Sequence, residues 1–235
     1  KAFNWNAQFP DVFRNGGFDI VVGNPPYVNI ENVKQKERDY LLKNYKLVKG
    51  RFDLYAVFME RVLEILQKNG KFSFIIPFPF TYERYAEKLR EEIIDKYTIN
   101  EILDLSKNKI FNDAIVRNVV FILTKAKKIQ NKIKITSLNL EQGSFFIVSD
   151  SIIQESFKNN PNKSFRLDMS ENKFVIQNKL LENSQRLGNI FYVNWGARTG
   201  NIKKYVTKDE QVPMTKKMIN GKNVKRYYLN YTNDF

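Results

Sequence analysis

The stretch Phe18–Tyr27 constrains the fold of this chain more than any other. An apolar run at Ile20–Val22 meets Gly23 and then the residues Asn-Pro-Pro-Tyr. A short apolar run that is closed by a turn signal predicts a buried strand. Because proline can neither continue a sheet ladder nor enter a helix interior, the strand must end in a stiff loop. In open α/β sheets, ligands bind at the carboxyl ends of strands. The sequence therefore predicts a binding loop at Asn24–Tyr27.

Regular apolar patterns continue after this loop. A helix that begins at Asp53 and ends near Asn69-Gly70 is expected, because its apolar residues recur at helical spacing. A second helix is expected to be capped by Thr81. Buried strands are predicted at Lys71–Pro77, Ile99–Leu105 and Val116–Thr124. This alternation predicts an α/β fold that forms one half of a doubly wound sheet.

The sequence beyond Lys125 is less regular. Lys132–Thr136 alternates between charged and apolar residues, which predicts an exposed edge strand, and Phe145–Val148 is its expected partner. A helix is predicted at 171–181. From Leu187 the chain becomes rich in glycine, basic and aromatic residues. We therefore expect three regions, which span residues 1–150, 151–186 and 187–235.

Composition limits the possible functions. The 235 residues carry a formal net charge of +14, and 43% of them are hydrophobic, so a globular protein with an affinity for polyanions is expected. No apolar run approaches the ~18 residues that a membrane span requires, which favours nucleic acid over a membrane as the partner. The chain has no cysteine and no histidine, so disulfides, thiolate or zinc sites and histidine-based catalysis are excluded. Without a signal peptide, a cytoplasmic location is expected, and no metal is predicted.

The Asn24–Tyr27 loop resembles the catalytic loop of amino-methyltransferases that use S-adenosylmethionine. Its Asn-Pro-Pro-Tyr form is most similar to that of the DNA adenine-N6 enzymes. The resemblance implies that the Asn24 side-chain oxygen and the Pro25 carbonyl accept hydrogen bonds from the target amine, which favours a pyramidal nitrogen. It also implies that Tyr27 stacks on a base that has left the double helix.

The order of the later segments also resembles these enzymes, in the gamma-type arrangement of combined type II restriction–modification proteins. The implied fold is the C-terminal half of a Rossmann-like methyltransferase sheet, followed by the start of a target-recognition domain. The resemblance also implies that Phe111 is a second aromatic ring that packs against the flipped adenine. It implies that Pro26 and Phe58 contact the cofactor. Both phenylalanines also suit core positions, Phe111 at a strand entrance and Phe58 on an apolar helix face.

The basic region beyond Leu187 resembles the opening of a target-recognition domain that binds double-stranded DNA. Glycine, basic and aromatic residues together suit phosphate and base contacts. A β-rich surface domain with solvated charges is the alternative. The predicted DNA contacts are Arg198, Lys203, Lys204, Lys222, Lys225 and Arg226.

Two features of the family have no counterpart in this sequence: the glycine loop after its first strand and the acidic residue after its second. We therefore expect an internal fragment that is inactive alone. Its strand at 19–22 is expected to present an open edge that either self-associates or is covered by residues 1–17. Three alternatives to adenine methylation remain: a cytosine-N4 enzyme, a protein-glutamine methyltransferase and a non-catalytic DNA specificity module.

Overall fold

A computed structural model describes residues 3–107, 117–141, 144–168, 171–185, 187–192, 219 and 221–230. The chain divides into two compact units, Lys1–Leu180 and Leu181–Phe235. Among the described residues, no helix is long and apolar enough to cross a membrane.

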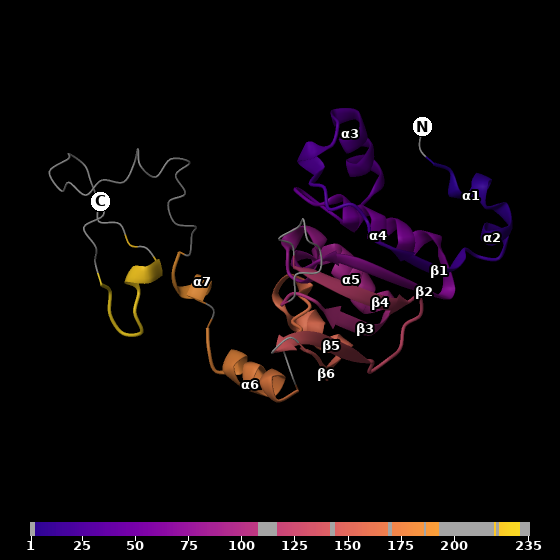
Figure 1. The fold of residues 1–235 in the computed structure, drawn as a ribbon. Coiled ribbons are helices and arrows are strands. Elements are labelled where there is room, and N and C mark those ends of the chain that lie inside the picture. The colour runs from indigo at the N-terminus through magenta and orange to yellow at the C-terminus, as the bar shows by residue number, and fades with distance from the viewer. Residues whose placement is uncertain are drawn as a thin grey trace, which may run out of the picture. The chain divides into compact units, whose positions relative to one another are not determined.

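The first unit is built on a six-stranded mixed sheet with the order β1-β2-β4-β3-β5-β6 (Figure 1). β1 is parallel to β2 and β3 is parallel to β5, whereas β4 is antiparallel to both β2 and β3. β1, β2, β3 and β5 therefore run in one direction, and their carboxyl ends meet at one edge. The predicted α/β fold class is confirmed. The strands are β1 (Phe18–Gly23), β2 (Leu66–Pro77), β3 (Thr98–Asp104), β4 (Asn118–Thr124), β5 (Lys132–Glu141) and β6 (Ser144–Ile153).

Helices connect the strands and precede them. The α-helices of the first unit are α1 (Trp5–Gln8), α2 (Pro10–Arg14), α3 (Gln35–Asn44), α4 (Leu54–Ile65) and α5 (Glu87–Lys96), and α6 (Glu171–Glu182) spans the boundary between the units. The short 3-10 helices are η1 (Ile30–Asn32), η2 (Phe78–Thr81), η3 (Arg84–Ala86), η4 (Gln154–Asn159) and η5 (Pro161–Lys163). The second unit contains α7 (Leu187–Ile190) and η6 (Gly221–Asn223).

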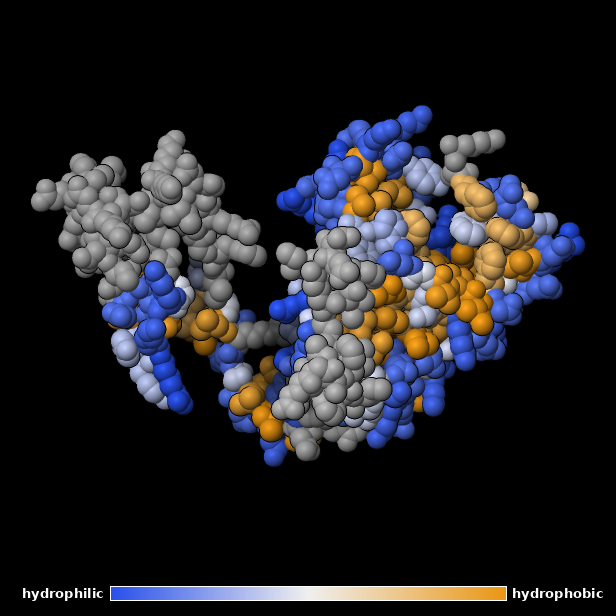
Figure 2. Space-filling model, in the orientation of Figure 1, coloured by the Kyte–Doolittle hydropathy of each residue, from blue (hydrophilic) through white to orange (hydrophobic). Residues whose placement is uncertain are grey.

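The core lies on one face of the sheet, against α4 and α5. Strand residues that point to this face, such as Phe72 of β2 and Phe121 of β4, are buried together with Met59 of α4 and Leu89 of α5. On the other face, Ser73 and Ile75 of β2 and Val120 and Ile122 of β4 are only half-buried. The prediction that the strand before the proline loop is buried is wrong: no residue of β1 is buried, and Ile20 and Val22 are 66% and 73% exposed, because no described segment covers this face of the strand. Figure 2 shows hydrophobic surface where Figure 1 places β1 and β2.

Residues 3–17 do not cover the exposed part of β1. They form α1 and α2, and their aromatic rings gather around Phe18 at the start of the strand, where Trp5, Phe9 and Phe13 contact it edge to face. Among the described residues, β1 pairs only with β2, so its other side is an open edge.

The predicted helix from Asp53 ends earlier than expected. α4 stops at Ile65, and Asn69-Gly70 lies inside β2 instead of ending the helix. Gly70 is required there by a tertiary contact, because a Cβ at this position would lie 2.8 Å from the carbonyl oxygen of Phe18 on β1. Local sequence cannot distinguish this close approach from a helix stop.

Two further predictions were wrong. Thr81 does not cap a helix: its hydroxyl donates to the carbonyl of Phe78, and α5 begins at Glu87. β5 is not an edge strand, because it pairs with both β3 and β6. Its residues Ile133 and Ile135 are buried, although charged residues alternate with them.

Candidate active site

The Asn24–Tyr27 loop lies at the carboxyl edge of the sheet, directly after β1. The segments that follow β2 and β3 lie at the same edge because those strands run parallel to β1. Asn24 and Pro26 are exposed, Pro25 is buried and Tyr27 is half-buried. The structure thus presents the amide side chain of Asn24 to solvent on a loop whose second residue is fixed in the interior.

The chain after this loop is tied to the start of α4. Leu54 N–H donates to the carbonyl of Val28 at 2.8 Å, and Ile30 N–H donates to the carbonyl of Phe52 at 2.8 Å. The side-chain amide of Asn29 donates to the Asp53 carboxylate at 3.1 Å. Asp53 therefore holds the loop exit rather than capping α4, since it makes no side-chain cap hydrogen bond to the helix. The proline loop is held by β1 on one side and by α4 on the other.

Tyr27 is fixed from beneath. Its hydroxyl donates to the carbonyl of Ile75 on β2 at 3.1 Å, and the Asn118 side-chain amide donates to the same hydroxyl at 3.1 Å. The ring also contacts Tyr55 of α4 edge to face, with centroids 6.2 Å apart. Burial raises the pKa of Tyr27, and the hydrogen bond from Asn118 opposes this only in part. The hydroxyl therefore stays protonated at neutral pH and serves as an anchor.

The two phenylalanines singled out in the sequence have different outcomes. Phe58 lies on α4 but is 47% exposed, so its interpretation as a core residue is wrong. The helix turns its neighbours Val57 and Met59 into the core instead. Phe111 lies outside the described residues, in the segment that precedes Arg117 and Asn118.

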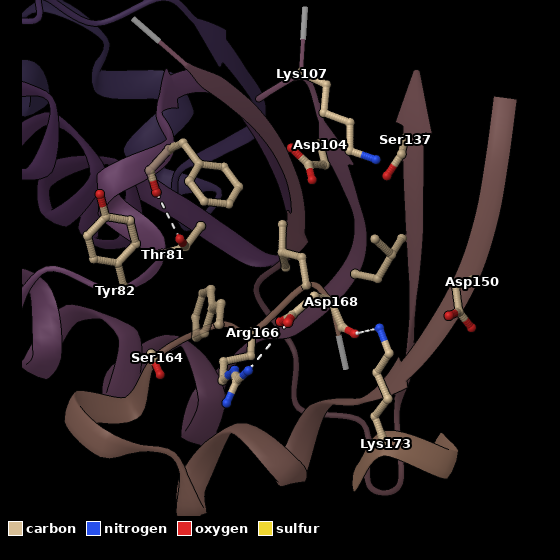
Figure 3. A pocket seen from close by; sticks show the side chains of 14 residues that line it. Thr81, Tyr82, Asp104, Lys107, Ser137, Asp150, Ser164, Arg166, Asp168 and Lys173 are labelled. Atoms are coloured by element: carbon tan, nitrogen blue, oxygen red, sulfur yellow. Dashed lines mark hydrogen bonds and ion pairs between the residues drawn. The ribbon is translucent and has the colours of Figure 1, made fainter. Parts of the chain in front are cut away.

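A cavity of about 780 Å³ opens at the same edge, beyond β2 (Figure 3). Its wall contains apolar residues of several elements, among them Phe78, Ile135 and Phe165. Acidic and basic side chains share the wall: Arg166 pairs with Asp168 at 3.3 Å, and Lys173 donates to the carbonyl of Asp168 at 2.9 Å. Sequence reasoning missed this cavity because its residues come from segments far apart in the chain. Its remaining lining residues are Thr81, Tyr82, Asp104, Lys107, Ser137, Asp150, Ser164 and Leu167.

In the second unit, three of the predicted DNA contacts are described. Lys225 begins a tight turn, in which its main-chain N–H donates to the carbonyl of Tyr228 at 2.9 Å. Arg226 lies over the ring of Tyr227, with the guanidinium carbon 5.2 Å from the ring centroid. Lys222, Lys225 and Arg226 are all exposed. Arg198, Lys203 and Lys204 lie outside the described residues.

The proline loop, the strand β1 before it and the helix α4 after it all fall within one matched family region. Residues 1–111 match the family described as Eco57I restriction-modification methylase. The resemblance to restriction–modification methyltransferases is confirmed. The methylase match runs from α1 through β3 and ends at Phe111.

Curated restriction–modification methyltransferases are similar over a longer part of the chain. The type II methyltransferase M.BstVI of Geobacillus stearothermophilus is 29% identical over 214 residues, which are 83% of this chain and 38% of that protein. The putative type II restriction enzyme and methyltransferase RM.MjaORFECS2P of Methanocaldococcus jannaschii is 29% identical over 187 residues, 78% of this chain and 15% of that protein. The chain therefore spans less than half of the length of these relatives.

Among solved structures, the type IIG restriction endonuclease BpuSI superimposes with a TM-score of 0.49 at 19% identity, covering 70% of this chain and 22% of that one.

Proposed function

We propose that this chain supplies the catalytic loop of a site-specific DNA methyltransferase, which transfers a methyl group from S-adenosylmethionine to the N6 amine of adenine. The observation that carries the proposal is the Asn-Pro-Pro-Tyr loop at the carboxyl end of β1, with Asn24 exposed and Tyr27 anchored. An exocyclic amine is a poor nucleophile because its lone pair is delocalised into the ring. Two fixed acceptors that bind both N–H groups localise this lone pair, and they need no reorganisation during the reaction.

The proposed roles follow from the positions in the loop. The side-chain oxygen of Asn24 and the carbonyl oxygen of Pro25 accept from the target amine. The ring of Tyr27 stacks on the extrahelical base, at a height set by its anchored hydroxyl. Phe111 is proposed as the second ring of this base site.

S-adenosylmethionine is the proposed cofactor, and it supplies the electrophilic methyl group when bound. Pro26 and Phe58 fit this role as apolar contacts, since both are exposed and Phe58 presents an aromatic face that the core does not use. These two residues alone make a partial site. The chain is therefore proposed to act together with cofactor-binding segments of the kind it lacks, and to be inactive without them.

We propose that residues 187–235 open a target-recognition region for double-stranded DNA. The turn at Lys225–Tyr228 supports this, because it presents Arg226 and the 85% exposed ring of Tyr227 together. Arginine suits phosphate and guanine contacts, and an exposed ring suits stacking. Lys222, Arg198, Lys203 and Lys204 are proposed to contribute phosphate contacts.

The open edge of β1 supports a further proposal about association. Ile20 and Val22 are exposed beside main-chain groups that no described residue pairs. Edges of this kind recruit other strands. We propose that the isolated chain self-associates there with a second copy.

Single-turnover methyl transfer by the natural full-length protein tests the proposed function. Duplex DNA and labelled S-adenosylmethionine are supplied, and the nucleosides are separated after digestion. Asn24→Ala should lower the rate by roughly 10²–10³, with little change in cofactor affinity, because it removes one preorganised acceptor. Asn44→Ala is the control, since Asn44 is an exposed amide on α3 that donates to the carbonyl of Tyr40.

The product distinguishes the alternatives. Label in N6-methyladenine supports the proposal, whereas label in N4-methylcytosine or in a protein substrate assigns a different acceptor. DNA binding without any methyl transfer by the unmodified protein would favour a non-catalytic specificity module. A normal rate for Asn24→Ala would remove Asn24 from the reaction.

A further inference from the structure

The side chain of Asn118 connects β4 to the proline loop. Among the described residues, no other side-chain hydrogen bond joins these two segments. Asn118 is the first residue of β4, pairs with Pro77 of β2 and is 0% exposed. Side chains alternate along a strand, so the next residues on the same face as Asn118 are Val120 and Ile122, which are apolar and only half-buried. A buried amide at this position therefore departs from the pattern of the strand, and such a group requires a polar partner.

The orientation of this amide follows from proton counting. A phenol has one proton to donate, and Tyr27 gives it to the carbonyl of Ile75. Toward Asn118 the same hydroxyl can only accept, so the NH₂ group of Asn118 must face Tyr27 and its oxygen must face away. This oxygen is buried and has no hydrogen-bond partner among the described residues. Within the described part of the chain, the acceptor of Asn118 is thus unsatisfied while its donor holds Tyr27.

The backbone around Asn118 is also fixed at the carboxyl edge. Leu105 N–H, after β3, donates to the carbonyl of Asn118 at 3.1 Å, and Phe78 N–H, after β2, donates to the carbonyl of Arg117 at 2.7 Å. The ends of β2 and β3 and the start of β4 therefore meet at this residue. A side chain that leaves such a junction has little freedom to move.

We propose that Asn118 is a positioning residue for methyl transfer: it fixes the hydroxyl of Tyr27 and, through that side chain, the ring and the Pro25 carbonyl two residues before it in the loop. This inference rests on the proposed function of the Asn24–Tyr27 loop. Asn118 itself does not touch the target base. Its effect is on the geometry of groups that must lie within a fraction of an ångström of their reacting positions.

The test combines three variants of the full-length protein in single-turnover methyl transfer. Asn118→Val and Tyr27→Phe should each lower the rate roughly 10- to 100-fold, because a misplacement of about 1 Å has an effect of this size. Affinities for S-adenosylmethionine and DNA should stay within about threefold. Because both changes break the same contact, the double variant should be no slower than Tyr27→Phe alone. Multiplied effects in the double variant would overturn the proposal.

Asn131→Val is the matched control. Asn131 is a buried amide that donates to the carbonyl of Ile99 at 2.7 Å and to Gln154 at 3.0 Å, next to the amino end of β5 and away from the proline loop. It should lower the melting temperature but leave the single-turnover rate of the folded protein unchanged. An equal loss of rate in Asn131→Val would show that Asn118 acts through stability alone.

Asn118→Asp supplies a readout that a purely structural role would not give. A protonated aspartic acid can donate to the hydroxyl of Tyr27, whereas the carboxylate cannot. The rate of this variant, divided by that of the unmodified protein at each pH, should therefore rise as pH falls toward the range in which a buried carboxyl binds a proton. A flat ratio would contradict the proposal. Absence of methyl transfer by the unmodified protein would instead refute the proposed function.

Discussion

Arg90 offers the sharpest test of how the carboxyl edge of the sheet is held. It lies on α5, is 0% exposed, and donates to three main-chain carbonyls: Phe80 at 2.6 Å, Asn162 at 2.6 Å and Lys163 at 3.1 Å. Burial lowers the pKa of Arg90 to about 10, so the guanidinium is still charged at neutral pH. One side chain thus connects α5 to the segment after β2 and to η5.

The magnitude follows from these contacts. Hydrogen bonds to a charged group contribute ~1.5–3 kcal/mol each, and a buried carbonyl that loses its donor costs ~1–3 kcal/mol. The sum for three such bonds overestimates the loss, because the structure relaxes and water replaces part of the lost hydrogen bonding. We therefore expect Arg90→Met to lower the free energy of unfolding by about 3–5 kcal/mol. This is a large part of the ~5–15 kcal/mol that is typical of a folded protein. Arg90→Lys should lose about half as much, because a lysine reaches fewer of these carbonyls.

Urea denaturation followed by circular dichroism measures these differences. Lys88→Met is the control, since Lys88 lies exposed on the same helix and its replacement should change the unfolding free energy by less than about 0.5 kcal/mol. If Arg90→Met unfolds within that margin of Lys88→Met, the buried guanidinium does not hold these segments and the argument fails.

Two other predictions concern buried charge and the open edge. Burial raises the pKa of Glu60, although the N–H groups of Lys46 and Leu47 at 2.7 and 3.0 Å oppose this. The stability that Glu60 provides is therefore present below its ordinary pKa and is lost as pH rises through the raised value. The difference in unfolding free energy between the unmodified protein and Glu60→Gln should shrink from acid to neutral pH. A difference that grows would contradict this. Ile20→Lys should abolish self-association of the isolated chain in analytical ultracentrifugation without lowering its stability. Ile129→Lys is the control: Ile129 is 81% exposed, and this variant should still self-associate. A monomeric unmodified chain would refute the association.

The sequence predicted the parts of the fold that local patterns determine. β1 and the loop after it were recognisable because a β-branched run and two prolines restrict the same ten residues. β3 and β4 lie within two residues of their predicted bounds, since buried strands read as continuous apolar runs. The start of α4 was also correct, because its apolar face repeats at helical spacing.

Other features depend on contacts between distant residues and could not be read locally. Gly70 resembles a helix stop but instead admits the carbonyl of Phe18. The charged alternation of β5 resembles an exposed edge, yet β6 covers that edge. Asn118 at the start of a strand has no local sign of its contact with Tyr27, which is 91 residues away. From one sequence, an asparagine without a tertiary role cannot be distinguished from one that positions a distant loop.

The buried polar residues share one physical role. Irregular segments at the carboxyl edge leave main-chain groups that no strand can pair, and each of these must find a partner. Arg90 supplies donors to the segments after β2 and before Phe165, Glu60 supplies acceptors to Lys46 and Leu47, and Asn118 holds the proline loop through Tyr27. All three side chains belong to helices or strands whose backbones are fixed by their own hydrogen bonds. Loops held in this way keep their geometry without a ligand, which is the condition under which fixed acceptors can lower a reaction barrier.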